Sequence, residues 1–300
     1  MEKNTYNVYF AWKNTENKIV VDGENGFCTY SDNITIEHAK MLYRNGVFKT
    51  KQITVRNCNI TRINENGNLY FNFDFSILWN KEKRTYDGLP YKDYILYSIT
   101  VHNPDDKMSG FKSISGIPFN CYCDRKALNP DFICYDCYSR KQLKRYIDLH
   151  FKCAKNEFFY NHVELTIDDI PYINDCYFRF ESFGELTSEL KVKNYFLICE
   201  KNKNCFFAFF TKLPFIVDAA FKKYGLKKPG NCKIILSSPL KNIKAIVPDA
   251  YKYFIDATFT VFTKQYVKEH NITINCLKKC INCLKCYGKN GVTELFEIEK

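Results

Sequence analysis

The chain has 300 residues, of which 44 are Lys or Arg and 33 are Asp or Glu, so its formal net charge is +11. Hydrophobic residues make up 46% and aromatic residues 17%, which suffices for a packed core and excludes a wholly disordered chain. No run of about 18 apolar residues occurs, which excludes a membrane-spanning helix. Met1 to Thr5 lead into a charged segment without an apolar core, so we expect no secretory signal and a cytoplasmic protein.

Fifteen cysteines are the outlier in this composition. Because the number is odd, they cannot all pair within one chain, and in a reducing compartment clustered cysteines more often bind metal than form disulfides. Abundant Lys, Asn, Ile, Tyr and Phe indicate an A+T-rich gene, and the basic residues are scattered along the chain. The net charge is therefore weak support for nucleic-acid binding.

The first 110 residues predict a β-rich domain. Short strand-like runs occupy residues 5–12, 18–21, 52–55, 69–78 and 94–101, separated by turn signals. Asn66-Gly67 lies between two such runs, which is typical of a β-hairpin with a two-residue turn. One helix is expected over residues 34–44, with Asp32 or Asn33 as its cap and Gly46 as its end.

Residues 111–300 predict a second domain in which strands and helices alternate. Strands are expected at 176–180, 205–210 and 232–236, with helices at 186–199 and 215–224; Pro214 and Gly225 mark the limits of the second helix. This alternation favours βαβ units and a parallel sheet, so the predicted class is α/β, or α+β for the whole chain. In such sheets functional residues lie beyond the carboxyl ends of the strands.

The strongest local motif is a group of four cysteines near the C-terminus, Cys276, Cys280, Cys283 and Cys286. Two-residue spacings let one tight turn direct two sulfurs at one ion, and neighbouring lysines favour the thiolate form. Four thiolates suit either a structural Zn²⁺ site or an iron–sulfur cluster. Incidental cysteines in a cytosolic protein are the alternative interpretation.

A second group consists of Cys121, Cys123, Cys134 and Cys137. Each group could hold its own ion, or the two groups could meet, because one precedes and the other closes the βα domain. Four other cysteines, Cys176, Cys199, Cys205 and Cys232, lie in apolar runs, where free cysteine behaves as a small hydrophobic residue. We therefore expect these four in the core.

The βα half resembles the phage and bacterial family known as gene product 88-like proteins, over residues 114–300. Three features carry the resemblance: a cysteine group that closes on Cys137-Tyr138; the blocks FRFESFGE at 178–185, FAFFTK at 207–212 and PGNCKIILSS at 229–238; and the closing cysteine group, followed by Tyr287 and a strand at 292–298. Where this family often has His or Asn, the chain has Glu181. The resemblance implies a partial β/α barrel, by analogy with radical-enzyme-like folds whose cysteine loop after the first strand holds a cluster.

Three functions are compatible with these patterns. The first is a metallo-enzyme with an iron–sulfur cluster at the strand carboxyl ends, in which Arg179 anchors an anionic substrate, Glu185 acts as acid or base and Lys212 completes a charged pocket. A salt bridge between Arg179 and Glu185 is the structural alternative. The second is a zinc-stapled module that binds nucleic acid or a host protein. The third is a virion or accessory structural protein.

Overall fold

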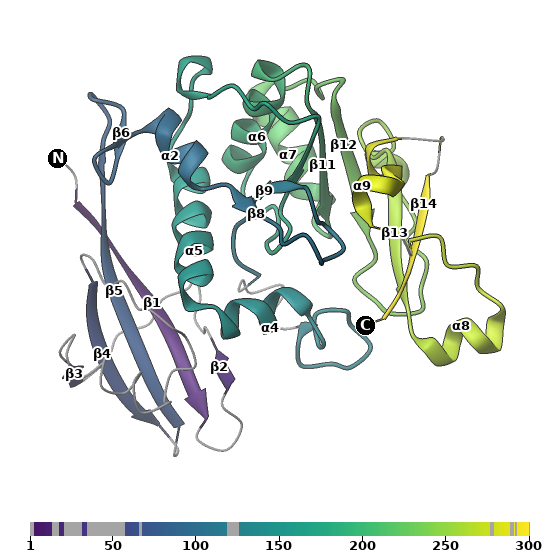
Figure 1. Cartoon of the computed structure of the whole chain (residues 1–300), viewed down its shortest axis with the longest axis horizontal. Coiled ribbons are helices and arrows are strands. Elements are labelled where there is room, and N and C mark those ends of the chain that lie inside the picture. Colours follow the sequence, from purple (N-terminus) through teal and green to yellow (C-terminus); the bar gives the residue numbers. More distant parts are fainter. Residues whose placement is uncertain are drawn as a thin grey trace.

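The computed structural model describes residues 3–13, 18–20, 32–34, 58–65, 68–118, 126–276, 279–288, 291 and 293–299, with side chains from residue 80 onwards except at 144, 147, 148, 150 and 151. Two sheets organise these residues (Figure 1). The mixed α/β class expected from the sequence is confirmed.

The N-terminal sheet is antiparallel and has the strand order β2-β1-β5-β4-β3. Its strands are β1 (Lys3–Lys13), β2 (Lys18–Val20), β3 (Asp32–Ile34), β4 (Cys58–Glu65) and β5 (Asn68–Asn80), extended by β6 (Thr85–Tyr86) and β7 (Leu89–Pro90). Glu65 of β4 pairs with Asn68 of β5, which confirms the expected hairpin. The expected strand at 52–55 and residues 35–44 of the expected helix lie outside the described residues, and the two cap candidates lie in β3.

The strand predicted over residues 94–101 is wrong for most of its length. Helix α2 (Tyr91–Tyr97) occupies its first half and strand β8 covers only Thr100–Val101. Tyr91, Tyr94 and Ile95 are buried at helical spacing. The apolar run therefore follows a period of about 3.6 residues rather than 2, because its buried side chains pack against other helices.

The second sheet has seven strands in the order β14-β13-β12-β11-β10-β9-β8. After β8, its strands are β9 (Lys112–Ile114), β10 (Tyr177–Phe180), β11 (Phe206–Thr211), β12 (Cys232–Ser237), β13 (Ala257–Phe262) and β14 (Glu294–Ile298). Strands β9 to β14 are parallel neighbours in chain order, and β8 is antiparallel to β9. This order is that of consecutive β/α units in a barrel.

Helices join these strands. They are α4 (Tyr138–Arg145) and α5 (Ile147–His162) after β9, α6 (Glu189–Lys201) after β10, α7 (Pro214–Tyr224) after β11, and α8 (Lys264–His270) and α9 (Cys280–Cys283) after β13. Ser188 caps α6 by accepting a hydrogen bond from the Lys191 amide at 3.2 Å. Helix α7 begins at Pro214 and ends at Gly225, whose φ of +61° closes the helix in the left-handed region, as expected.

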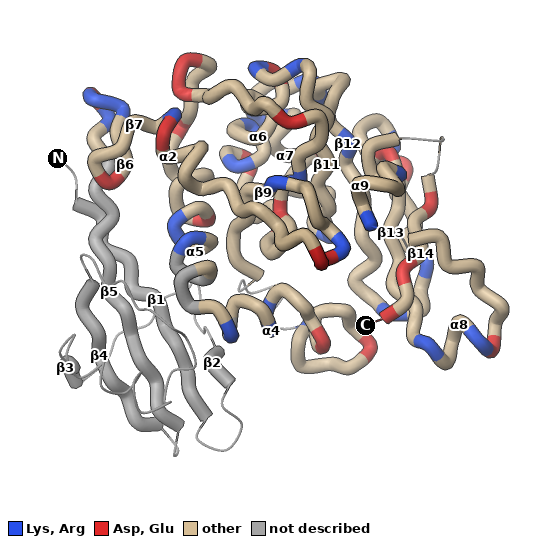
Figure 2. Tube along the Cα trace, viewed as in Figure 1, with Lys and Arg blue, Asp and Glu red and all other residues tan. Residues whose placement is uncertain are grey.

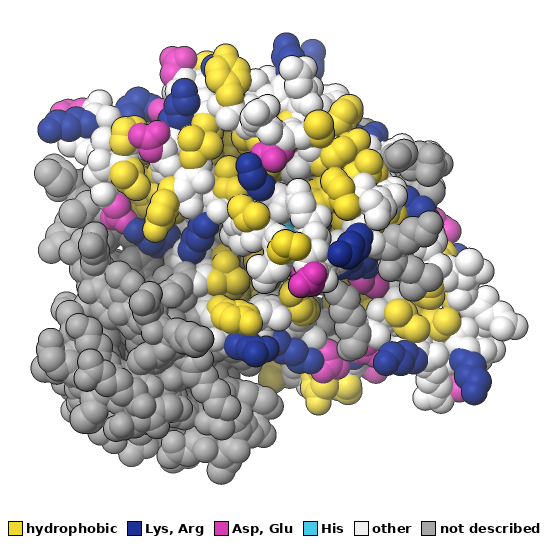
Figure 3. All heavy atoms as spheres, in the orientation of Figure 1, with side chains coloured by type: hydrophobic (Ala, Val, Ile, Leu, Met, Phe, Trp, Pro, Cys, Tyr) yellow, Lys and Arg dark blue, Asp and Glu magenta, His cyan; other side chains and the backbone are white. Residues whose placement is uncertain are grey.

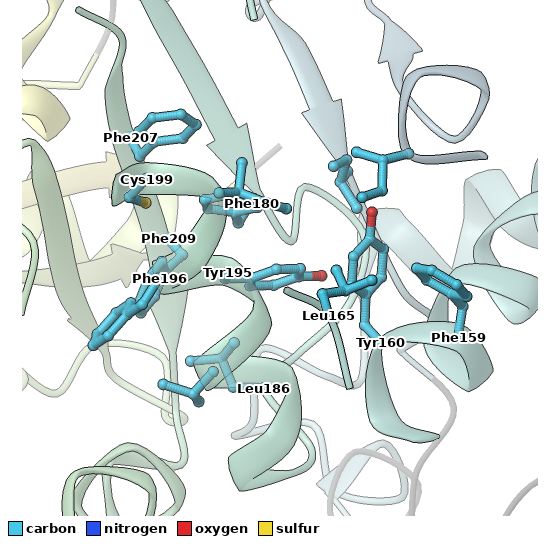
Figure 4. Close-up of a cluster of buried hydrophobic side chains, with 14 of the residues drawn as sticks. Phe159, Tyr160, Leu165, Phe180, Leu186, Tyr195, Phe196, Cys199, Phe207 and Phe209 are labelled. Atoms are coloured by element: carbon cyan, nitrogen blue, oxygen red, sulfur yellow. The ribbon is translucent and has the colours of Figure 1, made fainter. Parts of the chain in front are cut away.

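The two faces of the second sheet have different partners. On one face, alternate residues such as Phe178, Phe180 and Phe207 pack against α5, α6 and α7 in the main core, where the rings of Phe180 and Tyr195 stack with centroids 4.2 Å apart (Figure 4). We call this the helix face. On the opposite face a smaller cluster contains Ala208, Ile235, Ala257 and Leu295, with Phe210, Phe259, Cys286 and Tyr287 packed against it. We call this the loop face, because the C-terminal cysteines lie there.

Residues ahead of position 111 already contribute to the main core. Tyr86, Tyr91, Tyr94 and Ile95 are buried together with residues of α5 and the sheet. Of the cysteines expected in the core, Cys199, Cys205 and Cys232 are buried there, which confirms that expectation, whereas Cys176 is exposed. None of the helices in the described part of the chain combines the length and apolar character needed to cross a bilayer.

Candidate metal centre and the charged network on the opposite face

The C-terminal cysteines lie on one loop, described at residues 275, 276 and 279–288, which we call the cysteine loop. Cys280 and Cys283 are the first and last residues of the single-turn helix α9, and Cys286 follows in a 3-10 turn (Lys285–Tyr287). Leu284, with φ of +52°, and Gly288, with φ of +85°, adopt left-handed conformations on either side of that turn. A left-handed leucine is uncommon, so the surrounding contacts must hold the chain reversal between Cys283 and Cys286 in place.

The cysteine loop is hydrogen-bonded to three parts of the second sheet. The Cys276 amide donates to the carbonyl of Phe296 on β14 at 3.0 Å. The Cys280 amide donates to the carbonyl of Lys107, between β8 and β9, at 2.8 Å. The Tyr287 hydroxyl donates to the Phe178 carbonyl of β10 at 3.3 Å. The loop thus ties together elements that are far apart in sequence.

Two cations face this loop. The ammonium of Lys107 lies 3.2 Å from the Cys276 sulfur and 3.0 Å from its carbonyl oxygen, and forms an ion pair with Glu297. The Arg179 guanidinium carbon lies 3.6 Å from the centroid of the Phe210 ring, and its Nε is buried with no hydrogen-bond partner among the described residues. A stacked guanidinium with an unused N–H is ready to meet an anionic acceptor.

The thiols are half-buried, and their protonation reflects competing effects. Burial raises the pKa of Cys276 and Cys280, and raises that of Cys286 to about 12. Lys107 opposes this rise in the pKa of Cys276 and Cys280, and Arg179 opposes it in the pKa of Cys280 and Cys286. Cys276, Cys280 and Cys286 therefore each lie near enough to Lys107 or Arg179 for that cation to favour the thiolate.

No group of three or more His, Cys, Asp or Glu side chains in the described part of the chain lies close enough together to hold a metal ion in this conformation. The proposed ligands fit a soft metal, because all four are sulfurs on one loop. Beside them lie the ammonium of Lys107 and the buried N–H of Arg179, which has no partner among the described residues. The metal site therefore stays a prediction.

The first cysteine group is only partly described. Cys121 and Cys123 lie outside the described residues, Cys134 is buried, and Cys137 immediately precedes α4. The chain before Cys134 lies against the carboxyl end of β12, where the Ile133 amide donates to the Pro239 carbonyl at 3.0 Å. This group follows β9, the first parallel strand of the sheet, and its role in metal binding also stays a prediction.

The three residues predicted as a charged pocket fall into two places. Glu185 is buried and accepts hydrogen bonds from the amides of Leu186 and Lys212, both at 2.9 Å, while the Lys212 ammonium lies 3.8 Å from it. Arg179 instead lies over Phe210 on the loop face. The structure therefore brings Glu185 and Lys212 together and places Arg179 with the cysteine loop.

Sequence reasoning missed a buried ionic network at the carboxyl end of β10. The Lys191 ammonium, from α6, lies 2.7 Å from Glu157 Oε2 and 2.7 Å from Glu181 Oε1, and donates to the Glu185 carbonyl at 2.9 Å. Glu181 also accepts from the Tyr195 hydroxyl at 2.5 Å and from the Gly116 amide at 2.9 Å. The side chains of Lys191 and Glu181 are completely inaccessible to solvent.

The backbone around this network has features that let the carboxylates approach it closely. Glu181 has φ of +55°, a left-handed conformation that changes the direction of the chain directly after β10. A Cβ added at Gly184 would lie 2.0 Å from Glu181 Oε2, and one added at Gly116 would lie 1.8 Å from Glu157 Oε2. Both positions therefore require glycine so that the carboxylates can approach. The sequence signal was a lysine among the mostly apolar residues that α6 buries.

Burial and the paired charges have opposite effects on the pKa values of this network. It raises the pKa of Glu181, against the opposing attraction of Lys191. Burial alone would lower the pKa of Lys191, but Glu157 and Glu181 outweigh it and the pKa is raised. Lys191 therefore stays charged and joins α5, α6 and the end of β10.

Comparison of the chain with protein-family models, with curated proteins and with solved structures finds no match.

Proposed function

We propose that this chain is a metal-binding protein in which the cysteine loop holds Zn²⁺ or an iron–sulfur cluster through Cys276, Cys280, Cys283 and Cys286. The observation that carries the proposal is the placement of four sulfurs on one loop, flanked by Lys107 and by the buried Nε of Arg179, which has no partner among the described residues. Hydrogen-bond donors around a thiolate set are the outer partners that metal sites require.

The loop's position favours a structural role for the metal. Its backbone is bonded to β14 at one end and to the β8–β9 connection at the other. A metal bound by four thiolates supplies folding free energy and leaves no open coordination position. Holding the loop would keep β14 and the β8–β9 connection in place, and Tyr287 would stay packed between Phe111 and Tyr177.

The other functions receive less support. Glu185 already has both of its oxygens bonded to backbone amides, which suits a structural carboxylate better than an acid or base. Basic and acidic residues are interspersed along the described trace, and on the face shown in Figure 3 charged side chains of both signs lie among hydrophobic ones (Figures 2 and 3). The described residues of that face form no continuous basic stripe of the kind that nucleic-acid binding favours. A phage origin, a cytoplasmic location and kinship with the gene product 88-like family are part of the same proposal.

Elemental analysis of anaerobically purified protein, together with its visible absorbance spectrum, tests the proposal. We expect about one equivalent of zinc per chain, or iron with inorganic sulfide and visible absorbance, at the cysteine loop. The double substitution Cys280→Ser/Cys283→Ser should remove this metal, whereas Cys176→Ser, at an exposed cysteine, should retain it. Equal metal content in the two variants would contradict the assignment.

A further inference from the structure

We infer that Lys107 and Arg179 are the positioning cations of the cysteine loop, which neutralise its thiolates, with Arg179 contributing the larger share. This inference rests on the proposed metal-binding function. The two residues come from different parts of the sheet, the β8–β9 connection and β10, and neither carries a metal-binding sequence signal.

Lys107 contacts the loop through both its backbone and its side chain. Its carbonyl accepts from the Cys280 amide at 2.8 Å, while its ammonium donates to the Cys276 carbonyl at 3.0 Å and lies 3.2 Å from the Cys276 sulfur. Lys279 adds a third link by donating to the Pro104 carbonyl at 3.0 Å. Lys107 therefore touches the first two cysteines of the set from outside the loop.

Arg179 approaches the same loop from the sheet. Its guanidinium stacks on Phe210, and Phe210 and Cys286 pack against the same small cluster on the loop face. The Tyr287 hydroxyl bonds to the carbonyl of Phe178, the residue that precedes Arg179.

The buried Nε of Arg179 is the unusual feature of this site. Buried polar atoms in proteins are nearly always hydrogen-bonded, and this one has no acceptor among the described residues. A neutral thiol is a weak acceptor, whereas a metal-bound thiolate accepts readily and carries the charge that a guanidinium complements. A thiolate of the metal-loaded loop would therefore be a suitable partner for this N–H.

The charge balance explains why two cations are needed. Four thiolates around one Zn²⁺ leave two negative charges, which burial makes costly unless cations lie nearby. Lys107 is partly neutralised by its ion pair with Glu297. Arg179 forms no ion pair with a described carboxylate, so no carboxylate of the described residues offsets its charge.

The test is the zinc affinity of purified protein, measured by competition with a chromophoric chelator at fixed pH. Outer-sphere partners of metal sites typically change affinity by about 10–100-fold. We expect Arg179→Gln to weaken zinc binding by about 30-fold and Lys107→Gln by about 10-fold. The matched control, Lys112→Gln, removes a lysine of β9 that pairs with Asp175 at 3.0 Å and should bind as the unaltered protein does.

Two further readouts separate charge compensation from a merely structural effect. Arg179→Lys keeps the charge and should recover most of the lost affinity, and in cobalt-loaded Lys107→Gln the thiolate-to-metal absorbance should shift. Unaltered protein that contains and takes up neither zinc nor iron would refute the proposed function itself, and unaltered protein that holds iron but binds no zinc would overturn this inference as stated for zinc. Unaltered protein that binds zinc, with both glutamine variants equal to Lys112→Gln, would overturn only this inference.

Discussion

Replacing Lys191 with methionine should destabilise the fold severely. The substitution keeps much of the side-chain volume but removes the ammonium that lies 2.7 Å from both Glu157 and Glu181. Glu181 has no solvent access, so water cannot replace the lost partner, whereas the side chain of Glu157 is 16% exposed and can be rehydrated. The consequence is an uncompensated charge on Glu181 inside the core.

The magnitude follows from that charge. Removing one partner of a buried ion pair typically costs about 3–5 kcal/mol. Glu181 keeps its bonds from the Tyr195 hydroxyl and the Gly116 amide, so we expect a loss near the lower limit, about 3 kcal/mol. With a urea dependence of about 1–3 kcal/mol per molar, the unfolding midpoint should fall by roughly 1–3 M.

Urea unfolding followed by circular dichroism measures this loss. The control is Lys193→Met on the same helix, which removes an ion pair with the largely exposed Glu164 and should cost less than about 1 kcal/mol. Since burial raises the pKa of Glu181 above its unfolded value, protonation relieves the variant as pH falls, and its deficit should be smaller at about pH 5 than at about pH 8. Similar losses for the two variants, or a deficit independent of pH, would refute the reasoning.

Two further substitutions test the packing and the capping of the same core. Gly184→Ala places a Cβ 2.0 Å from Glu181 Oε2 and should lower the free energy of unfolding in urea by about 1–3 kcal/mol. In the control, Gly230→Ala, the added Cβ meets nothing within 4 Å, so its stability should stay within about 0.5 kcal/mol of the parent protein. Equal effects of the two substitutions would contradict the close approach at Gly184. Asp169 caps the turn at 166–169 and pairs with Arg84; burial raises its pKa, but the bonds from Arg84 and Thr166 outweigh this and lower it. Asp169→Asn should therefore cost about 1–2 kcal/mol at neutral pH, and this difference should vanish as acid protonates the parent carboxyl below about pH 4; a pH-independent difference would oppose this assignment.

The sequence patterns predicted three neighbouring parallel strands well, because buried strands read as short, continuous apolar runs, but they did not predict β9 or β13. Strands β10, β11 and β12 lie within one residue of their expected limits. The run at 94–101 failed because a short apolar segment fits a strand or a buried helix equally well, and only its packing against α5 decides between them.

One part of the candidate site could be predicted from the sequence and the other could not. The spacing of the cysteines predicts a metal-binding loop, since local sequence determines which sulfurs one turn can direct at the same ion. Lys107 and Arg179 could not be assigned to it, because they are about 170 and 100 residues away from the cysteines in sequence and meet them only through the sheet. Lys191 and Glu181 likewise become partners only when α6 packs across the end of β10.

The metal content of the purified chain tests the central claim most directly. Metal bound in about one-to-one ratio or as a cluster, lost in Cys280→Ser/Cys283→Ser and retained in Cys176→Ser, is the result we predict. A folded, anaerobically prepared protein that contains neither zinc nor iron, and takes up neither when they are supplied, would contradict it.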